Sequence, residues 1–80
     1  MKGTVALINP KRGMAALITV NEEYTTFVSL GHHVDIGDII SGDLESLGEE
    51  TWYNESQMEK IDVFVEDIYG AKATALKIIS

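Results

Sequence analysis

The chain has 80 residues, of which 45% are hydrophobic, and a formal net charge of −7. This length predicts one domain, the apolar fraction argues against intrinsic disorder, and no apolar run approaches the ~20 residues of a membrane-spanning helix. There is no cysteine, which excludes disulfides, thiolate zinc sites and thiol catalysis. Because Met1–Thr4 does not open an apolar signal-peptide stretch, we expect a cytoplasmic protein without membrane contact.

The charge is divided unevenly along the chain. Residues 1–21 contain three bases and no acid, residues 22–71 hold all 13 acids and one base, and residues 72–80 add two bases. The ends together therefore carry +5 and the middle −12. If the ends meet, a basic patch lies on an acidic body, and a Debye length of about 8 Å lets it act independently of the net charge. The simpler interpretation of the acids is that they keep a small domain soluble.

The first 30 residues predict three strands. Residues 3–8 and 14–20 are rich in aliphatic side chains, and the turn Asn9–Gly13 joins them, with proline fixing φ and glycine supplying a positive φ. A polar turn, Asn21–Glu23, leads into residues 24–30. Alternating side chains there predict a strand with one buried face.

The remaining chain predicts further strands. Residues 31–37 form a connection, 38–44 a fourth strand and 71–79 a final strand. Residues 58–69 fit either a helical stripe, which Asn54–Gln57 would cap, or an alternating strand. The β-branched density of Asp62–Val65 favours the strand. Five or six short strands predict a small closed barrel, which removes exposed sheet edges.

Three segments of the first hairpin resemble the opening of a cold-shock domain. They are Lys2–Val5, Asn9–Gly13 and Leu17–Val20. The likeness is weaker at Thr26–Ser29 and at Gly70–Ala73, and it covers about the first 30 residues well. It implies that residues 1–80 form a five-stranded OB-type barrel, here with an elaborated region between the third strand and the last hairpin.

The resemblance also implies binding of single-stranded RNA or DNA, which cold-shock domains achieve by stacking bases on aromatic side chains. Four of those aromatics are replaced here, and each stacked base contributes about 1–3 kcal/mol. What remains is the basic charge of the chain ends and one aromatic ring, Phe27, for which packing is favoured over a stacking role. The nucleic-acid site implied in this way comprises Lys2, Lys11, Arg12, Phe27, Lys72 and Lys77.

The alternative is a protein-interaction module that has lost nucleic-acid binding. One candidate surface consists of the aliphatic residues at the former stacking positions, namely Leu7, Ile8, Met14 and Leu17. The other is the acidic region around Trp52 and Tyr53. Adjacent side chains on an extended segment face opposite ways, so we expect one aromatic to pack and the other to be exposed. We favour Trp52 as the packed ring and leave Tyr53 open.

No constellation of residues predicts catalysis, a metal site or a cofactor. His32 and His33 are adjacent, so on a strand they would point to opposite faces, whereas metal ligands usually share one face. Close carboxylate pairs are expected by chance among 13 acids. We therefore expect a non-catalytic binding module.

Overall fold

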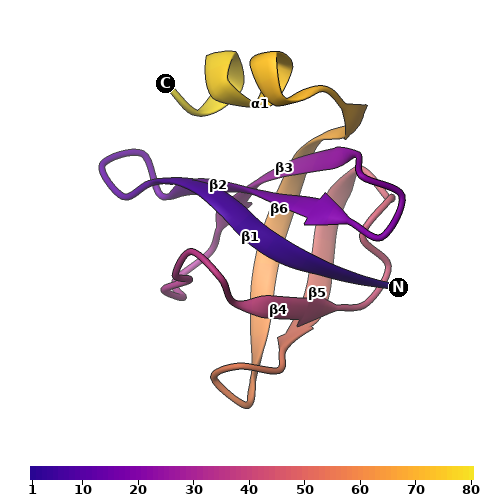
Figure 1. Ribbon diagram of the computed structural model, residues 1–80. Coiled ribbons are helices and arrows are strands. Elements are labelled where there is room, and N and C mark those ends of the chain that lie inside the picture. Colours follow the sequence, from indigo (N-terminus) through magenta and orange to yellow (C-terminus); the bar gives the residue numbers. More distant parts are fainter.

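The computed structural model describes residues 1–80 as six strands followed by one short helix (Figure 1). The elements are β1 (Lys2–Asn9), β2 (Met14–Thr19), β3 (Tyr24–Ser29), β4 (Ile39–Ser41), β5 (Gly48–Asn54), β6 (Glu59–Gly70) and α1 (Lys72–Ile79). All strands belong to one sheet, and α1 lies outside it.

The sheet closes into a barrel in the order β1-β2-β3-β6-β5-β4, with every neighbouring pair antiparallel. The all-β barrel is therefore confirmed, but the predicted count of five strands is wrong. The strand that was not predicted is β5, which pairs with β6 from Gly48 to Asn54. The short β4 pairs with Lys2–Thr4 of β1 and with Tyr53 and Asn54 of β5. This short strand closes the ring where β1 and β5 would otherwise leave open edges.

The predicted first hairpin is confirmed. β1 pairs with β2 from Gly3 opposite Thr19 to Asn9 opposite Met14, with a bulge between Val5 and Leu7. Gly13 closes the turn with a φ of 63°, the conformation for which glycine was expected.

Alternation along the strands sets the core inside the barrel. The core cluster consists of Val5, Ala15, Leu17, Phe27, Val34, Ile40, Leu44, Trp52, Ile61, Val63 and Val65. At its centre the rings of Phe27 and Trp52 meet edge to face, with centroids 5.0 Å apart and an interplanar angle of 74°, an arrangement that aromatic pairs prefer.

The region predicted as ambiguous is a strand. In β6, Ile61, Val63 and Val65 are buried while Asp62 and Phe64 are exposed, as strand alternation requires. Its partner β5 lies within the region expected to be an elaboration.

Two strand predictions need correction. The strand predicted over residues 38–44 is confined to Ile39–Ser41, because Gly42 turns the chain with a φ of 143°. The strand predicted over residues 71–79 is instead helix α1. Alanine, leucine and lysine, all strong helix formers, make up most of this segment, and Ala75 and Ile79 lie four apart on its buried side.

Candidate functional site

The predicted stacking residue Phe27 is inside the barrel. Its exposed fraction is 0%, and its ring packs against Trp52. A base stacks only on a ring with a free face, so Phe27 offers no platform to a nucleotide in this structure. Leu17, at another former stacking position, is also fully buried.

The predicted basic residues do not form one patch. Lys2 lies at the start of β1, where its Nζ is 3.1 Å from the Oε1 of Glu55. That ion pair lowers the pKa of Glu55. The β1–β2 turn with Lys11 and Arg12 lies beyond the other end of β1, which spans about 23 Å at ~3.3 Å per residue. Lys2 thus lies on a different part of the surface from Lys11 and Arg12.

One part of the predicted meeting of the chain ends does occur. The guanidinium of Arg12 donates to the carbonyls of Ile78 and Ser80, and the amide of Asn9 donates to the carbonyl of Ile79. These carbonyls belong to the C-terminal end of α1, whose partial negative charge favours a cation. Arg12 is therefore engaged by the helix, whereas Lys72 and Lys77 are exposed on it.

Helix α1 covers part of the outer face of the first three strands, and a groove of about 390 Å³ beside it stays open. The groove is lined by residues of β1, β2 and β4 and of the β2–β3 turn, namely Lys2, Gly3, Thr4, Ile18, Thr19, Val20, Glu22 and Ile39. The helix contacts β1, β2, β3 and β6, and Figure 1 shows it lying across β2 and β3. Beneath it, Ala16 and Thr26 are directly paired, point away from the core cluster and have exposed fractions of 0%. Ala75 and Ile79 of α1 are buried but do not belong to the barrel core, so they bury their surface against this outer face.

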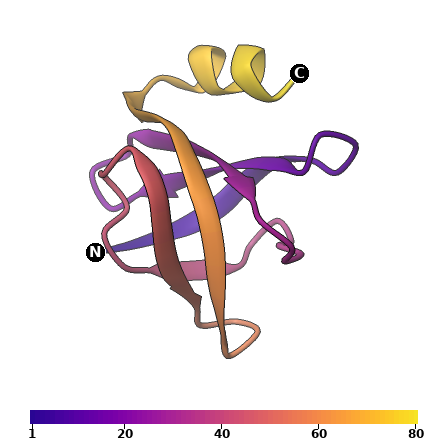
Figure 2. The ribbon, with the colours of Figure 1, turned by 180° about the vertical axis from the view of Figure 1, so that it is seen from behind.

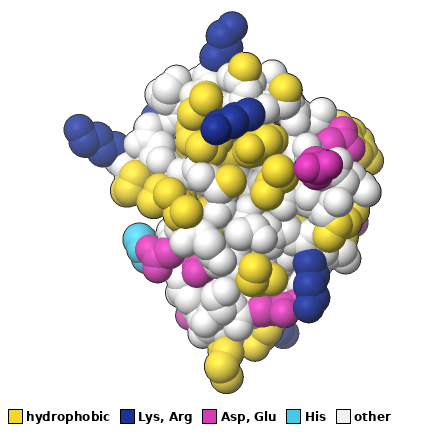
Figure 3. Space-filling view, in the orientation of Figure 1, with side chains coloured by type: hydrophobic (Ala, Val, Ile, Leu, Met, Phe, Trp, Pro, Cys, Tyr) yellow, Lys and Arg dark blue, Asp and Glu magenta, His cyan; other side chains and the backbone are white.

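The aliphatic residues predicted to meet a partner do not form one exposed surface. Leu17 belongs to the barrel core, and Ile8 packs against that core. Met14 is buried, and Leu7 and Ile8 are half-buried. Figure 3 shows hydrophobic side chains gathered around α1, with basic side chains among them and most acidic ones toward the edges of this view.

Trp52 and Tyr53 behave as predicted for adjacent residues on a strand. Trp52 is 1% exposed and donates its indole N–H to the carbonyl of Asp43 at 3.0 Å. Tyr53 is 40% exposed on the outer face of β5. The prediction that one ring packs and the other is exposed is confirmed.

The outer face of β5 and β6 has no helix over it, as the view from behind shows (Figure 2). On β6 the outward residues include Asp62, Phe64 and Glu66, and Glu49 of β5 lies directly opposite Phe64. Phe64 is 40% exposed. We call this surface, made by Glu49, Thr51, Tyr53, Asp62, Phe64 and Glu66, the open face. It places exposed aromatic rings among carboxylates.

A groove of about 500 Å³ runs over part of the open face. It is lined by Leu30, Glu49, Glu50, Thr51, Asp62 and Val63. The hydroxyl of Thr51 donates to Asp62 Oδ1 at 2.9 Å, which orients that carboxylate. Leu30, 44% exposed, forms an apolar wall. The groove therefore presents oriented negative charge beside apolar surface.

A buried carboxylate holds the end of β5 in place. Asp38 Oδ2 accepts hydrogen bonds from Asn54 Nδ2 at 2.9 Å, Gln57 Nε2 at 2.7 Å and the backbone N–H of Asp35 at 3.0 Å. Burial raises the pKa of Asp38, but these hydrogen bonds outweigh it and leave the pKa below its ordinary value. The ionised form of Asp38 thus fastens the connection after β3 to the β5–β6 hairpin.

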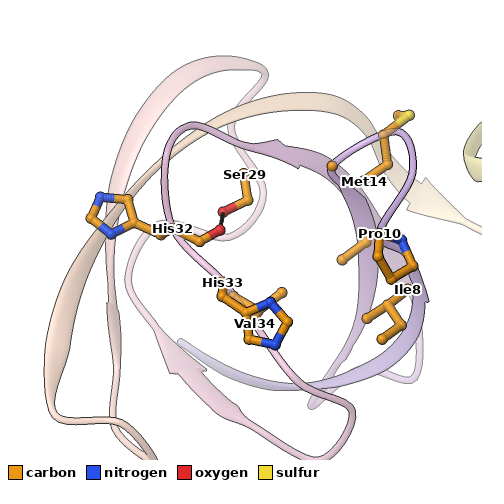
Figure 4. Close-up of a pocket in the computed structure, with 9 residues that line it drawn as sticks. Ile8, Pro10, Met14, Ser29, His32, His33 and Val34 are labelled. Atoms are coloured by element: carbon orange, nitrogen blue, oxygen red, sulfur yellow. Dashed lines mark hydrogen bonds between the residues drawn. The ribbon is translucent and has the colours of Figure 1, made fainter.

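The two histidines lie at one mouth of the barrel, beside a cavity of about 140 Å³ (Figure 4). Their rings point in different directions. The hydroxyl of Ser29 donates to the backbone carbonyl of His32, and His33 Nε2 is 2.7 Å from Asp35 Oδ1. Ser29 is thus engaged by a carbonyl and not by an imidazole, and no group of three potential metal ligands occurs.

Comparisons with protein-family models, with curated proteins and with solved structures find no match to this chain. No helix in the structure has the length and apolar character needed to cross a membrane.

Proposed function

We propose that this protein is a non-catalytic protein-binding module, whose open face takes a basic segment of a partner. The observation that carries the proposal is Phe64, an aromatic ring 40% exposed on a sheet face and surrounded by carboxylates. Aromatic residues dominate binding energy at protein interfaces, and complementary charge steers association. Residues 48–70 contain seven acids and one base, so the complementary partner is cationic.

Single-stranded nucleic acid, which the cold-shock resemblance implies, has less support. The surviving stacking ring is in the core, and helix α1 covers part of the outer face of β1–β3. The groove that stays open beside α1 is lined by Lys2 but by no aromatic ring. The carboxylates of the open face repel phosphate. Binding would depend on exposed lysines alone, of which Lys2 is paired with Glu55.

The non-catalytic part of the proposal is supported by the side chains at the barrel mouth. The cavity there, about 140 Å³, is smaller than the ~300–1,000 Å³ of typical ligand sites, whereas the groove of about 500 Å³ on the open face is within that range and is taken as the place of the partner segment. Nucleophilic catalysis needs a base within hydrogen-bond reach of the nucleophile, whereas the Ser29 hydroxyl donates to a carbonyl.

Fluorescence anisotropy with labelled oligolysine and labelled oligo(dT) tests the proposed function. Any acidic protein attracts oligolysine, so two matched double variants locate the contact. Glu49→Gln with Asp62→Asn removes two of the three carboxylates of the open face, and Glu22→Gln with Glu23→Gln removes the same charge at the β2–β3 turn. We expect oligolysine to bind at least about fivefold more weakly to the first variant and less than about twofold more weakly to the second. Equal losses in the two variants, or tighter binding of oligo(dT) than of oligolysine, would overturn the proposal.

A further inference from the structure

The open face has one aromatic ring with no lysine or arginine opposite or beside it in the sheet. The two exposed rings on it are Tyr53 and Phe64. Tyr53 is directly opposite Lys60 in the β5–β6 pairing, so a cation of the protein itself lies beside it. Phe64 is opposite Glu49 and has Asp62 and Glu66 as its neighbours two residues away on β6. The carboxylates therefore gather around Phe64. Of these carboxylates, Asp62 has a histidine beside it, with 4.0 Å between His32 Nε2 and Asp62 Oδ2.

The spacing of these side chains is set by the sheet. Side chains two residues apart on one strand face lie about 6.6 Å apart, and directly opposite Cβ atoms of neighbouring strands about 4.5–5.5 Å apart. Asp62 thus flanks the ring along the strand, and Glu49 flanks it from β5. Glu66, which is exposed, lies two residues beyond Phe64 at the bulge between Val65 and Asp67. On the side of the ring away from β5, Val28 of β3 is paired with Phe64 and supplies apolar surface. A flat cation stacked on the ring has carboxylates within reach along its edges.

From this arrangement we propose that the Phe64 site binds the guanidinium of an arginine in the partner segment, with carboxylates of Asp62, Glu66 and Glu49 accepting its hydrogen bonds. The inference rests on the proposed function and names the side chain that anchors the partner. Guanidinium is planar, stacks on aromatic faces, is more weakly hydrated than ammonium and donates in pairs to carboxylates. The ammonium group of lysine supplies the positive charge, but it is not planar, so it neither stacks flat on the ring nor donates two parallel hydrogen bonds to a carboxylate.

The groove indicates where the rest of the segment lies. It borders Glu49 and Asp62 and is walled by Leu30. The backbone N–H of Leu30 donates to the carbonyl of Asp62 at 2.9 Å, which fixes this wall against β6. A segment with its arginine over Phe64 continues past Asp62 into this groove.

The experiment compares labelled oligo-arginine, oligolysine and oligocitrulline, which is the neutral analogue of arginine, on the wild-type protein and three variants. Phe64→Leu removes the ring, Phe64→Tyr retains it, and Tyr53→Leu removes the other exposed ring. An exposed cation–π contact contributes about 0.5–1 kcal/mol, or a factor of about 2–5 in affinity. We expect the wild type, Phe64→Tyr and Tyr53→Leu to prefer oligo-arginine over oligolysine by at least about threefold, and Phe64→Leu to lose that preference.

The outcomes separate the arginine site from the proposed function. If oligo-arginine and oligolysine bind the wild type equally well through the open face, or if Phe64→Leu retains the preference, the arginine site is wrong and the protein-binding module stands. Binding of oligocitrulline as tight as that of oligo-arginine would also overturn the arginine site, because charge would play no part. If neither cationic peptide binds the open face, both proposals fail.

Discussion

The barrel has two outer faces of opposite character. Part of the outer face of β1–β3 lies under α1 and presents small or aliphatic side chains such as Ala16 and Met14, both buried. The open face of β5 and β6 carries exposed aromatic rings and carboxylates, with no element packed over it. The three segments of the first hairpin that resemble a cold-shock domain contribute Val5 and Leu17 to the core and Lys2, Thr4 and Val20 to the groove beside the covered part. These three segments contain no aromatic residue, so the exposed aromatic rings of the molecule lie elsewhere.

The two phenylalanines test this contrast most strongly. Phe27 is fully buried against Trp52, so Phe27→Ala leaves a cavity in the core and should lower the free energy of unfolding by about 4 kcal/mol. Phe64 is 40% exposed, and Phe64→Ala should cost only about 1 kcal/mol. Urea denaturation measures both. Similar losses for the two variants would mean that Phe64 is a structural residue, and would remove the basis for a binding role.

A charge placed under α1 should destabilise the covered face. Ala16 has an exposed fraction of 0% beneath the helix, so Ala16→Glu should lower the free energy of unfolding by about 3 kcal/mol, or detach α1 at a similar cost. Ala73 is exposed in the first turn of α1. Ala73→Glu should therefore change stability by less than about 0.5 kcal/mol. Thermal unfolding and helix content by circular dichroism record both effects. Equal stability of the two variants would contradict the packing of α1 on β2 and β3.

The Asp38 hydrogen bonds should stabilise the base of the β5–β6 hairpin. Asp38→Ala leaves buried Asn54 without its acceptor and should cost about 2 kcal/mol, whereas Asp35→Ala, at an exposed side chain, should cost less than about 1 kcal/mol.

The same network predicts a dependence on pH. The pKa of Asp38 is lowered in the folded state, so its ionised form stabilises the fold above the unfolded-state pKa of about 3.9. This contribution is lost as the pH falls through the lower folded-state pKa. The stability difference between the wild type and Asp38→Ala should therefore narrow below about pH 4. A difference that stays constant or widens in acid would show that Asp38 is not held ionised.

The smallest effect is expected at Thr26. Its Oγ1 is buried beneath α1 and has no hydrogen-bond partner. Thr26→Val keeps the shape and removes the unpaired hydroxyl, so it should raise the free energy of unfolding by about 1 kcal/mol. Thr25→Val is the matched control, because Thr25 Oγ1 donates to the carbonyl of Leu44 at 2.9 Å and should lose stability on the same change. Destabilisation by both substitutions would show that the Thr26 hydroxyl is paired.

Much of the barrel was predictable from local patterns. The first hairpin follows from the turn residues Asn9–Gly13, and β6 from its β-branched residues at alternating positions. The prediction of a strand over residues 71–79 is wrong, because alanine, leucine and lysine there favour a helix. Ala75 and Ile79, four residues apart among helix formers, carried the signal for α1.

The open face was only partly predictable. Alternation explains why Trp52 is packed and Tyr53 exposed. Phe64 was not predicted as a site residue. The alternation that turns Ile61 and Val63 inward also turns Phe64 outward, between Asp62 and Glu66. Its position opposite Glu49 depends on the β5–β6 register, which no local pattern specifies. The burial of Phe27 likewise depends on which face of β3 becomes the inside of the barrel, which is set by the pairing of β3 with β2 and β6.

The location of binding is tested most directly by amide chemical shifts of the labelled protein during titration with oligo-arginine. The account predicts that shifts concentrate on the open face, at Glu49, Thr51, Asp62 and Phe64, while amides of α1 and of the β1–β2 turn change little. Shifts centred on Lys11, Arg12 and Lys72 would contradict it. An absence of shifts with oligo-arginine, together with shifts at these three residues during titration with oligo(dT), would also contradict it.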